Sequence, residues 1–379
     1  MEMFTLMHKN SPIATIQIKQ DANGNGYLHV DKILHEEHLP YGAKNSTGDR
    51  LDMMLTWWND SRCIPLGRPN YDSILDLVHG QTTSDLVPYS YMCSLTDCYW
   101  FRPEGLDVRW EDINFRKNGF SSEVYKRLFF DNMNEPITNL NSPDITTNGA
   151  LPKMWYEKDG EFFLVKSSKT QYPMDVYNEI IASEVFRQIG AEYVKYNYDT
   201  YANIEASVCK CFIDNDNIEF VSAEDLILDG YYDGPTDYLS AMKNFGHSNS
   251  VNMMILGDMI IGNIDRHERN YGQIISSNDQ SVIKSGPIFD NGGSDMLRCV
   301  DKYIYKPTNK TFDETMQLLD SETLLLAEKI DLTKIRMLMD SMPMQETTKQ
   351  CILENLNNRI ERALEIGRGK EHDFDREQR

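Results

Sequence analysis

Apolar and polar positions near the N-terminus are arranged as in a β-hairpin. Residues 4–7 and 13–18 are rich in apolar and β-branched side chains, and the polar residues 9–12 between them have the composition of a turn. Residues 47–130 change to a pattern of short helices and aromatic-rich loops. Aromatic pairs such as Trp57-Trp58 are more typical of core packing than of a ligand site, so this region predicts a core and no particular chemistry.

Helical spacing of apolar residues appears farther along the chain. Residues 172–190 repeat apolar side chains near one face, and Gly190 provides a stop signal. Residues 251–260 form an apolar, helix-like run. In the C-terminal third, helical patterns occur at 313–330, 332–341 and 346–366, and these have the spacing of core helices.

Two further hairpins and one strand are predicted between the helices. Residues 154–156 and 162–166 flank a turn at 158–160, and residues 271–275 and 282–289 flank a polar turn at 276–280. Residues 207–213 have the pattern of a single strand. Strands early and helices late predict the α+β class, with a β-rich N-terminal lobe over 1–205 and a mainly helical C-terminal lobe over 206–379. Within the first lobe we expect an N-terminal subdomain at about 1–130 and a loop-and-hairpin element at about 140–170.

The densest group of chemically active residues lies at 261–270 and 289–293. Asn270 follows Asp265 by five positions, and Asp290 follows after a further twenty. The first interval is the one between base and metal ligand in the catalytic loop of protein kinases. Phosphoryl transfer needs a carboxylate that receives the acceptor's proton and oxygen ligands that hold Mg²⁺ against the phosphates. The spacing therefore favours a two-lobed, protein-kinase-like fold with Asp265 as general base and Asn270 and Asp290 as Mg²⁺ ligands.

The same residues could also form an ordinary surface loop and turn without catalytic function. Asp, Asn and Gly are common turn formers, so 261–270 could be a solvated loop and Asp-Asn-Gly-Gly a simple turn. The apolar run at 251–260 favours the catalytic reading, because it would anchor the polar loop at the edge of a core. The hairpin at 271–289 would return Asp290 beside Asn270.

A polar, turn-forming loop at 141–153 precedes the first of these hairpins. Small and hydroxylated residues let backbone N–H groups approach phosphates, and Lys166 at the end of the second strand could reach the α and β phosphates of ATP. The alternative is a plain surface loop with a solvated lysine. The candidate nucleotide-binding residues of this element are Thr147, Asn148, Gly149, Ala150, Lys153 and Lys166.

The helix after the lysine strand is where a kinase places the glutamate that pairs with its lysine. We expect Glu179 in this role, and Glu184 on a solvated face remains the alternative. The strand at 207–213, which contains Cys209 and Cys211, could serve as a hinge whose backbone hydrogen-bonds adenine.

Composition narrows the class of protein. The chain of 379 residues is long enough for two lobes, and its start lacks the basic and apolar blocks of a signal peptide. No run of apolar residues is long enough to span a membrane, so we expect a cytoplasmic enzyme without a membrane partner. The net charge of −21 argues against direct nucleic-acid binding. Seven scattered cysteines lack zinc-site spacing and are expected to be reduced.

These motifs together resemble the HipA family, bacterial serine/threonine kinases of toxin–antitoxin systems whose cores are distantly similar to phosphoinositide kinases. The segment 148–153 resembles the family's phosphate loop ending in Pro-Lys, and Val165-Lys166 its ATP-binding lysine. Tyr177-Asn178-Glu179 is similar to its Asn-Glu helix, and residues 263–270 with Asp290 to its catalytic and metal-binding loops. The similarity covers about 140–365 and extends more weakly to the N-terminus.

The resemblance implies an ATP- and Mg²⁺-dependent serine/threonine kinase and assigns His267 as a loop-shaping residue of the catalytic set. It also implies a protein substrate, an antitoxin partner, and autophosphorylation of a hydroxyl in the phosphate loop, where Ser142, Thr146 and Thr147 are available. A phosphate there would add nearly two negative charges beside ATP, and the loop would be expected to leave.

One departure from the family pattern is the Asn-Gly-Gly that follows Asp290, in place of an apolar continuation. Two other functions stay open. The order of the motif also resembles lipid kinases such as phosphoinositide kinases, although the acidic chain lacks a membrane-facing basic stretch. The third possibility is an inactive kinase fold that only binds a nucleotide or a partner. The presence of all four candidate residues argues against it: Lys166, Asp265, Asn270 and Asp290.

Overall fold

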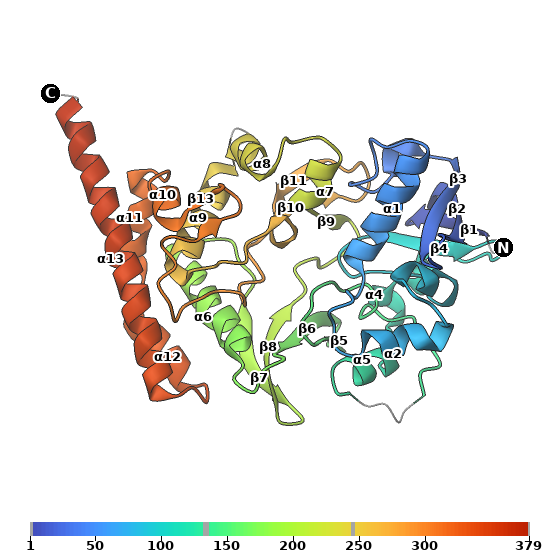
Figure 1. Cartoon of the computed structure of the whole chain (residues 1–379), viewed down its shortest axis with the longest axis horizontal. Helices are drawn as coiled ribbons and strands as arrows, with labels where there is room; N and C mark the ends of the chain where they lie inside the picture. Colours follow the sequence, from blue (N-terminus) through green and yellow to red (C-terminus); the bar gives the residue numbers. More distant parts are fainter. Residues whose placement is uncertain (1–2, 132–135, 244–246, 378–379) are drawn as a thin grey trace. The chain divides into compact units, whose positions relative to one another are not determined.

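The structure, a computed structural model, describes residues 3–131, 136–243 and 247–377 (Figure 1). The chain forms two compact units. The first comprises Met1–Lys169, Lys210–Tyr231 and Gln273–Ile283, and the second comprises Thr170–Cys209, Tyr232–Gly272 and Lys284–Arg379. The predicted division of the lobes at residues 205/206 falls inside the second unit and stays a prediction.

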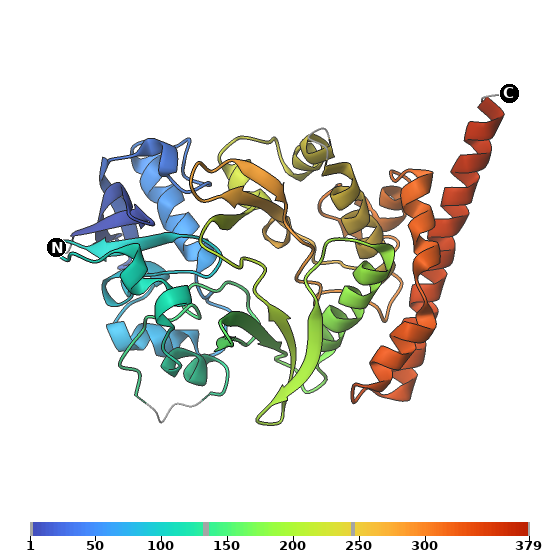
Figure 2. The same ribbon diagram turned by 180° about the vertical axis from the view of Figure 1, so that it is seen from behind.

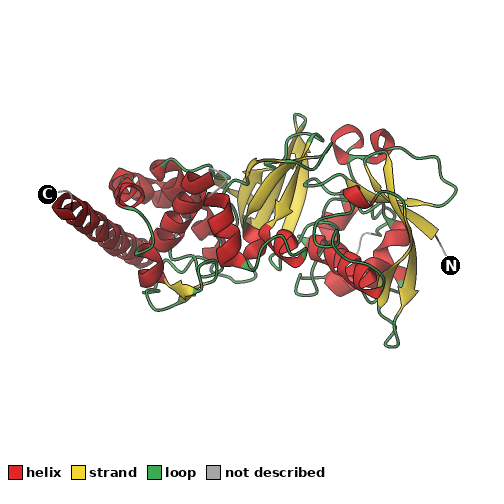
Figure 3. Ribbon diagram, turned by 90° about the horizontal axis from the view of Figure 1, so that it is seen from above, coloured by secondary structure: helices red, strands yellow, loops and turns green. Residues whose placement is uncertain are grey.

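An antiparallel sheet in the order β3-β2-β1-β4 begins the first unit. Its strands, yellow in Figure 3, are β1 (Met3–His8), β2 (Ser11–Gln20), β3 (Gly26–Ile33) and β4 (Tyr99–Pro103). The predicted N-terminal hairpin is confirmed, because β1 and β2 pair directly and Lys9 adopts a positive φ of 51° in their turn.

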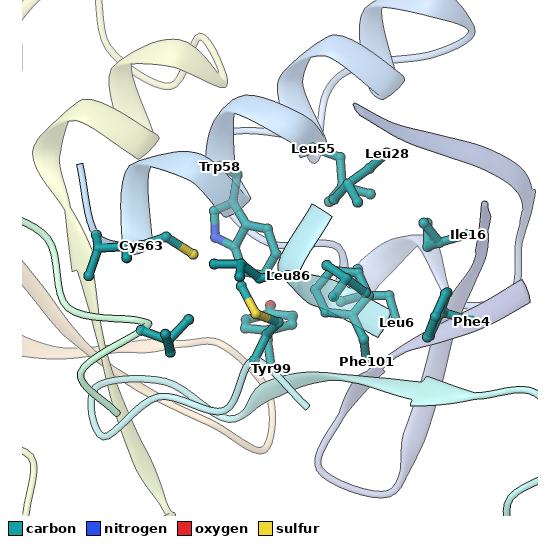
Figure 4. Packing of buried hydrophobic residues seen from close by; sticks show 14 of the residues in the cluster. Phe4, Leu6, Ile16, Leu28, Leu55, Trp58, Cys63, Leu86, Tyr99 and Phe101 are labelled. Atoms are coloured by element: carbon teal, nitrogen blue, oxygen red, sulfur yellow. The ribbon is translucent and has the colours of Figure 1, made fainter. Parts of the chain in front are cut away.

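The core of the first unit lies between this sheet and helix α1 (Asp49–Arg62) (Figure 4). Alternate strand residues such as Leu6 and Ile16 point to the helix side, where Leu55 and Trp58 are buried. The Trp58 ring meets that of Tyr99 edge-on at 5.2 Å. Trp58 is therefore a core residue, as its aromatic neighbourhood predicted.

Short elements complete the first unit. Both turn residues of its β5–β6 hairpin have positive φ, 55° at Asp159 and 77° at Gly160, as a two-residue hairpin turn requires. Strands β9, β10 and β11 form a sheet in the order β11-β10-β9. The bounds are α2 (Tyr71–Leu75), α3 (Trp110–Ile113), α4 (Phe115–Asn118), α5 (Glu123–Leu128), β5 (Lys153–Lys158), β6 (Glu161–Ser167), β9 (Ile218–Ser222), α7 (Ala223–Leu228), β10 (Gly272–Ser276) and β11 (Val282–Ser285).

The second unit is built mainly from helices, of which α6 and α9 lie next to each other. Helix α6 ends at Gly190 and α9 at Gly262, both with positive φ, so the predicted helices at 172–190 and 251–260 are confirmed. The bounds are α6 (Met174–Ile189), β7 (Tyr196–Tyr201), β8 (Ile204–Lys210), α8 (Pro235–Met242), α9 (Ser248–Ile261), β12 (Ile304–Tyr305), β13 (Lys310–Thr311), α10 (Phe312–Met316), α11 (Ser321–Leu325), α12 (Leu332–Asp340) and α13 (Glu346–Glu377).

The long helix α13 packs along α11 and α12, as both views in Figures 1 and 2 show. Its Arg359 donates to the carbonyls of Ile260 and Asp295, which ties the end of α9 to the segment after the second acidic turn. A cation at a helix C-terminus is favourable because carbonyl groups there lack partners. The helix thus supports the residues that precede and follow the candidate catalytic loops.

The α+β class and both later hairpins are confirmed, whereas three element bounds were predicted wrongly. The helix expected over 313–330 is divided, because the Asp320 side chain caps a new helix by accepting from the N–H of Thr323. The last helix passes residue 366, since Gly367 packs against Leu324 and does not end it. The strand expected at 207–213 begins at Ile204 and ends at Lys210. No helix in the described ranges is both long and apolar enough to cross a membrane.

Candidate active site

A buried ion pair anchors the candidate catalytic loop at 261–270 to helix α9. Arg266 donates from Nε and Nη2 to the two carboxylate oxygens of Asp258, each at 2.9 Å, and both side chains are fully buried. Burial alone would lower the pKa of Arg266, but the paired Asp258 carboxylate raises it above its usual value. Tyr305 adds a hydrogen bond of 2.5 Å to Asp258, and Asn263 adds one of 3.1 Å. This network holds the loop on the end of α9.

Arg266 also joins the candidate catalytic loop to the second acidic turn at 289–293. Its Nη1 donates to the carbonyl of Asn270 at 3.0 Å and to that of Phe289 at 2.6 Å. Nη2 donates to Oδ1 of Asn291 at 2.6 Å. One guanidinium therefore holds the residues on both sides of Asp290 close to Asn270, as the hairpin pattern predicted.

The Asp265 carboxylate, by contrast, is 58% exposed. Its backbone N–H donates to Oδ1 of Asn263, and Nζ of Lys306 lies 3.7 Å from its Oδ1. Gly293 lies against it, since a Cβ on Gly293 would be 2.6 Å from the Asp265 Cβ. The carboxylate is thus held in position by its backbone and remains accessible, which suits a group that receives a proton from a bound acceptor.

Asn270 and Asp290 are the predicted Mg²⁺ ligands. The Asn270 side chain is buried, and its Nδ2 donates to the carbonyl of Asp265 at 3.3 Å, which orients the amide. Asp290 has a φ of 57°, a conformation that is costly for a residue other than glycine and is concentrated at functional sites. Mg²⁺ is commonly held by one or two carboxylate or amide ligands plus substrate phosphates, so this donor set fits the ion.

His267 caps the short helical turn Glu268–Asn270 by accepting the N–H of Arg269 at 3.3 Å. Burial lowers the pKa of His267, although Asp265 and Asp290 act in the opposite direction. This contact is the kind expected of a loop-shaping residue. A direct part in catalysis stays a prediction.

Helix α6 holds the second acidic turn through two neighbouring side chains. Asn178 donates from Nδ2 to the carbonyls of Gly292 at 3.0 Å and Ser294 at 2.6 Å. Glu179, which is 2% exposed, accepts the N–H of Asn291 at 2.8 Å. Glu184 instead pairs with Arg187 one turn along the helix. Of the two glutamates considered, Glu179 is the one at the site.

The candidate phosphate loop is held by Arg68, a residue that the sequence analysis did not single out. Arg68 is 3% exposed and donates to the carbonyls of Thr147, Asn148 and Gly149. Lys153 donates from Nζ to the same Asn148 carbonyl at 2.8 Å. Gly149 has a φ of 100°, and a Cβ there would lie 1.9 Å from Nζ of Lys153. The positive φ favours glycine at this position, and a larger residue would also displace the end of the Lys153 side chain; the neighbouring Ala150 is exposed.

The loop hydroxyls differ in exposure. Ser142 and Thr146 are buried at 1% and 6% exposure, and each donates to a neighbouring acceptor, Asp144 and the Cys93 carbonyl respectively. Thr147 is half-buried, donates to the Pro143 carbonyl and accepts from the indole of Trp155. None of the three could receive a phosphate without a local change of the loop.

Lys166 lies on β6 opposite Lys153 and is 5% exposed. Cys209 and Cys211 are buried, as are three of the other five cysteines, and none of the seven, all of which lie within the described residues, forms a disulfide. The Cys211 N–H donates to the Phe162 carbonyl at 2.8 Å, so a hydrogen bond from Cys211 to adenine would have to use its carbonyl oxygen. Adenine binding at this strand stays a prediction.

The predicted residues therefore form two groups. Glu179, Asp265, His267, Asn270 and Asp290 come together in the second unit. The loop residues Thr147 to Ala150, Lys153 and Lys166 belong to the first unit. Their joint action on one nucleotide is part of the function proposed below.

Sequence reasoning named these motifs but missed the supporting residues Asp258, Arg68, Lys306 and Tyr305. Asp258 could have been found, since a carboxylate inside an apolar helix needs a buried partner and Arg266 is the nearest candidate downstream. No pattern in the neighbouring sequence predicts the contacts of Arg68, Lys306 or Tyr305.

Comparison with known proteins supports this description of the fold. No protein-family model matches the sequence, and no curated protein sequence matches it. Among solved structures, the chain is similar to HipA of Shewanella oneidensis MR-1, in a complex with HipB and operator DNA, with 13% identity and a TM-score of 0.55 over 95% of this chain and 96% of that one.

The chain is also similar to the proinflammatory kinase CtkA of Helicobacter pylori, with 20% identity and a TM-score of 0.50 over 59% of this chain and 95% of CtkA. This chain therefore has a HipA-like kinase fold, and the predicted resemblance is confirmed at the level of the fold.

Proposed function

We propose that this chain is an ATP- and Mg²⁺-dependent serine/threonine protein kinase of HipA type. The observation that supports the proposal is the Arg266 network, which joins the Asn270 carbonyl to the residues on both sides of Asp290, while Nδ2 of Asn270 donates to the Asp265 carbonyl. A kinase-like fold with this site intact favours catalysis over a purely binding role. A cytoplasmic location is part of the proposal.

In the proposed reaction Asp265 accepts the proton of the Ser or Thr hydroxyl of the protein substrate. Asn270 and Asp290 would hold Mg²⁺, which supplies charge neutralisation at the phosphates when it is bound. Lys306, 3.7 Å from Asp265, keeps positive charge beside the carboxylate in the free protein.

The first unit would supply the nucleotide contacts. Backbone N–H groups of Thr147 to Ala150 would receive the phosphates, with Lys153 and Lys166 adding positive charge. Lys166 would pair with Glu179, and the strand with Cys209 and Cys211 would bind adenine. Autophosphorylation of Ser142, Thr146 or Thr147 would require the loop to open, because their present hydrogen bonds occupy all three hydroxyls.

An antitoxin partner is also part of this proposal. The solved HipA structure is a complex with HipB and operator DNA, so a partner of the HipB kind is a reasonable candidate for this chain. The predicted absence of direct nucleic-acid contact rests only on the net charge of −21, and the HipA complex does not support it.

Calorimetric titration with ATP in the presence and absence of Mg²⁺ tests the proposal. The wild-type protein should bind ATP more tightly with Mg²⁺, Asp290→Ala should lose that enhancement, and Asp265→Asn should keep it. Wild-type protein that binds no Mg²⁺-ATP would contradict the proposal.

A further inference from the structure

The buried guanidinium of Arg68 makes an unusual set of contacts with the loop at 147–149. Nε donates to the Gly149 carbonyl at 2.7 Å, and Nη2 donates to the carbonyls of Thr147 at 2.6 Å and Asn148 at 3.1 Å. One side chain therefore binds the carbonyls of three consecutive residues. Arg68 lies 79 positions before Thr147, so this contact is tertiary.

The loop is also fixed by contacts on either side of the guanidinium. Nδ2 of Asn148 donates to the Ser61 carbonyl at the end of α1, at 2.6 Å. The backbone carbonyl of Asn148 accepts hydrogen bonds from both Lys153 and Arg68, so two cationic side chains bind one backbone oxygen. These bonds define the orientation of successive peptide groups, because each peptide plane is set once its carbonyl is held.

The charge of Arg68 has no carboxylate partner at hydrogen-bond distance among the described residues, and its Nη1 is buried without any hydrogen-bond partner. Burial lowers the pKa of Arg68 to about 10, so the guanidinium stays charged at neutral pH. A buried charge that is only partly compensated makes the surrounding region favourable for an anion.

We propose that Arg68 is a positioning residue that holds the Thr147–Gly149 peptides in the geometry that receives the ATP phosphates, and that its positive charge, which is only partly compensated, strengthens polyphosphate binding. This inference rests on the proposed kinase function, because it assigns the loop to phosphate. Arg68 lies outside all of the sequence motifs from which the site was predicted.

The test compares Arg68→Met, which keeps the length of the side chain but removes charge and donors, with Arg68→Lys, which keeps the charge. The matched control is Arg62→Met in the same unit, since Arg62 is also largely buried but pairs with Asp97 and not with the loop. Three quantities are measured: hydrogen exchange of the 147–150 amides without nucleotide, affinity for Mg²⁺-ATP, and affinity for adenosine.

In Arg68→Met we expect roughly tenfold faster exchange at 147–150 and roughly tenfold weaker Mg²⁺-ATP binding, with adenosine affinity unchanged. Arg68→Lys should retain part of the ATP affinity while its loop exchanges faster. If Arg68→Met does not fold, this lysine variant alone decides the outcome. Arg62→Met should leave all three quantities near wild type even where its melting temperature falls.

Hydrogen exchange at 147–150 that is unchanged in both Arg68 variants would overturn the inference. Changes in Arg62→Met as large as those in Arg68→Met would also overturn it. Equal losses for ATP and adenosine would overturn the phosphate role, because a positioning effect on phosphates spares the nucleoside. Wild-type protein that binds no Mg²⁺-ATP, with a loop that still loosens in Arg68→Met, would refute the proposed function and leave Arg68 a structural anchor only.

Discussion

The carboxylate of Glu179 accepts the backbone N–H of Asn291 at 2.8 Å. The sequence predicts that Glu179 orients a lysine, and the structure shows that it holds Asn291, the residue next to the candidate metal ligand Asp290. Its charge and its hydrogen-bond acceptor are therefore two separable contributions. Glu179 connects α6 to the site across 112 positions of sequence.

Replacement of Glu179 by Gln separates these contributions. A Gln oxygen can still accept from Asn291, so Glu179→Gln should keep Mg²⁺-dependent ATP affinity within a factor of about two while lowering phosphoryl transfer through loss of the charge. Glu179→Ala should lose both. Calorimetry and a phosphotransfer assay measure the two quantities, and equal behaviour of the Gln and Ala variants would contradict the separation.

Substitution of Gly293 tests whether the candidate base Asp265 is held in position. A Cβ at residue 293 would lie 2.6 Å from the Asp265 Cβ, so Gly293→Ala must displace one of the two segments. Displacement of a catalytic group by about 1 Å costs roughly hundredfold in rate, and we expect a loss of kcat of this order. Gly369→Ala is the control, because nothing lies within 4 Å of a Cβ there. A Gly293→Ala enzyme with the kcat of the control would show that Asp265 is not held as described.

The buried Arg266–Asp258 pair should dominate the stability of the site. Arg266→Met leaves Asp258 buried without its partner, which should lower the free energy of unfolding by about 3–5 kcal/mol. The exposed pair Arg368–Glu328 provides the comparison, and Arg368→Met should cost less than about 1 kcal/mol. Urea unfolding of the three proteins measures both values. Similar costs for the two variants would contradict the central role of Arg266.

The buried Asp144, which lies in the loop at 141–153, predicts a pH dependence of stability. Burial raises the pKa of Asp144 from its ordinary 3.8 to about 7, although Ser142 and the Trp155 N–H act in the opposite direction. Because the folded pKa lies above the unfolded one, the stability contributed by the protonated carboxyl is complete below about pH 4 and is lost as the pH rises through 7.

Asp144→Asn resembles the protonated carboxyl and cannot ionise. Relative to this variant, wild-type protein should lose stability steadily between about pH 4 and pH 7, measured by unfolding at a series of pH values. The exposed Asp107→Asn serves as the control and should show no such trend. A constant difference between wild type and Asp144→Asn across this range would rule out the buried carboxyl as the cause.

The elements around the candidate catalytic loop could be predicted because their contacts are local in sequence. Asp265, Asn270 and Asp290 are joined by one loop and one hairpin, so the hairpin pattern alone brings their backbones together. The Asn-Gly-Gly departure from the family pattern also has a local reason. Gly293 leaves room for Asp265, and Asn291 offers its side-chain oxygen to Arg266.

The remaining features depend on tertiary contacts that no period or motif encodes. Arg68 contacts the candidate phosphate loop across 79 positions of sequence, and the Tyr305 hydroxyl contacts Asp258 across 47. The divided helix at 313–330 was missed for a related reason. Its apolar spacing continues, but the capping bond of Asp320 starts a new helix, and a local polar contact outweighs the periodic pattern.

The most direct test of the kinase proposal is transfer of labelled phosphate. Wild-type protein and Asp265→Asn are incubated with Mg²⁺ and ATP that carries a labelled γ-phosphate, and any labelled residues are mapped by mass spectrometry. The account predicts label on Ser142, Thr146 or Thr147 in wild type and none in Asp265→Asn, which should still bind Mg²⁺-ATP. Equal labelling of the two proteins, or no labelling of wild type even with candidate protein substrates added, would contradict it.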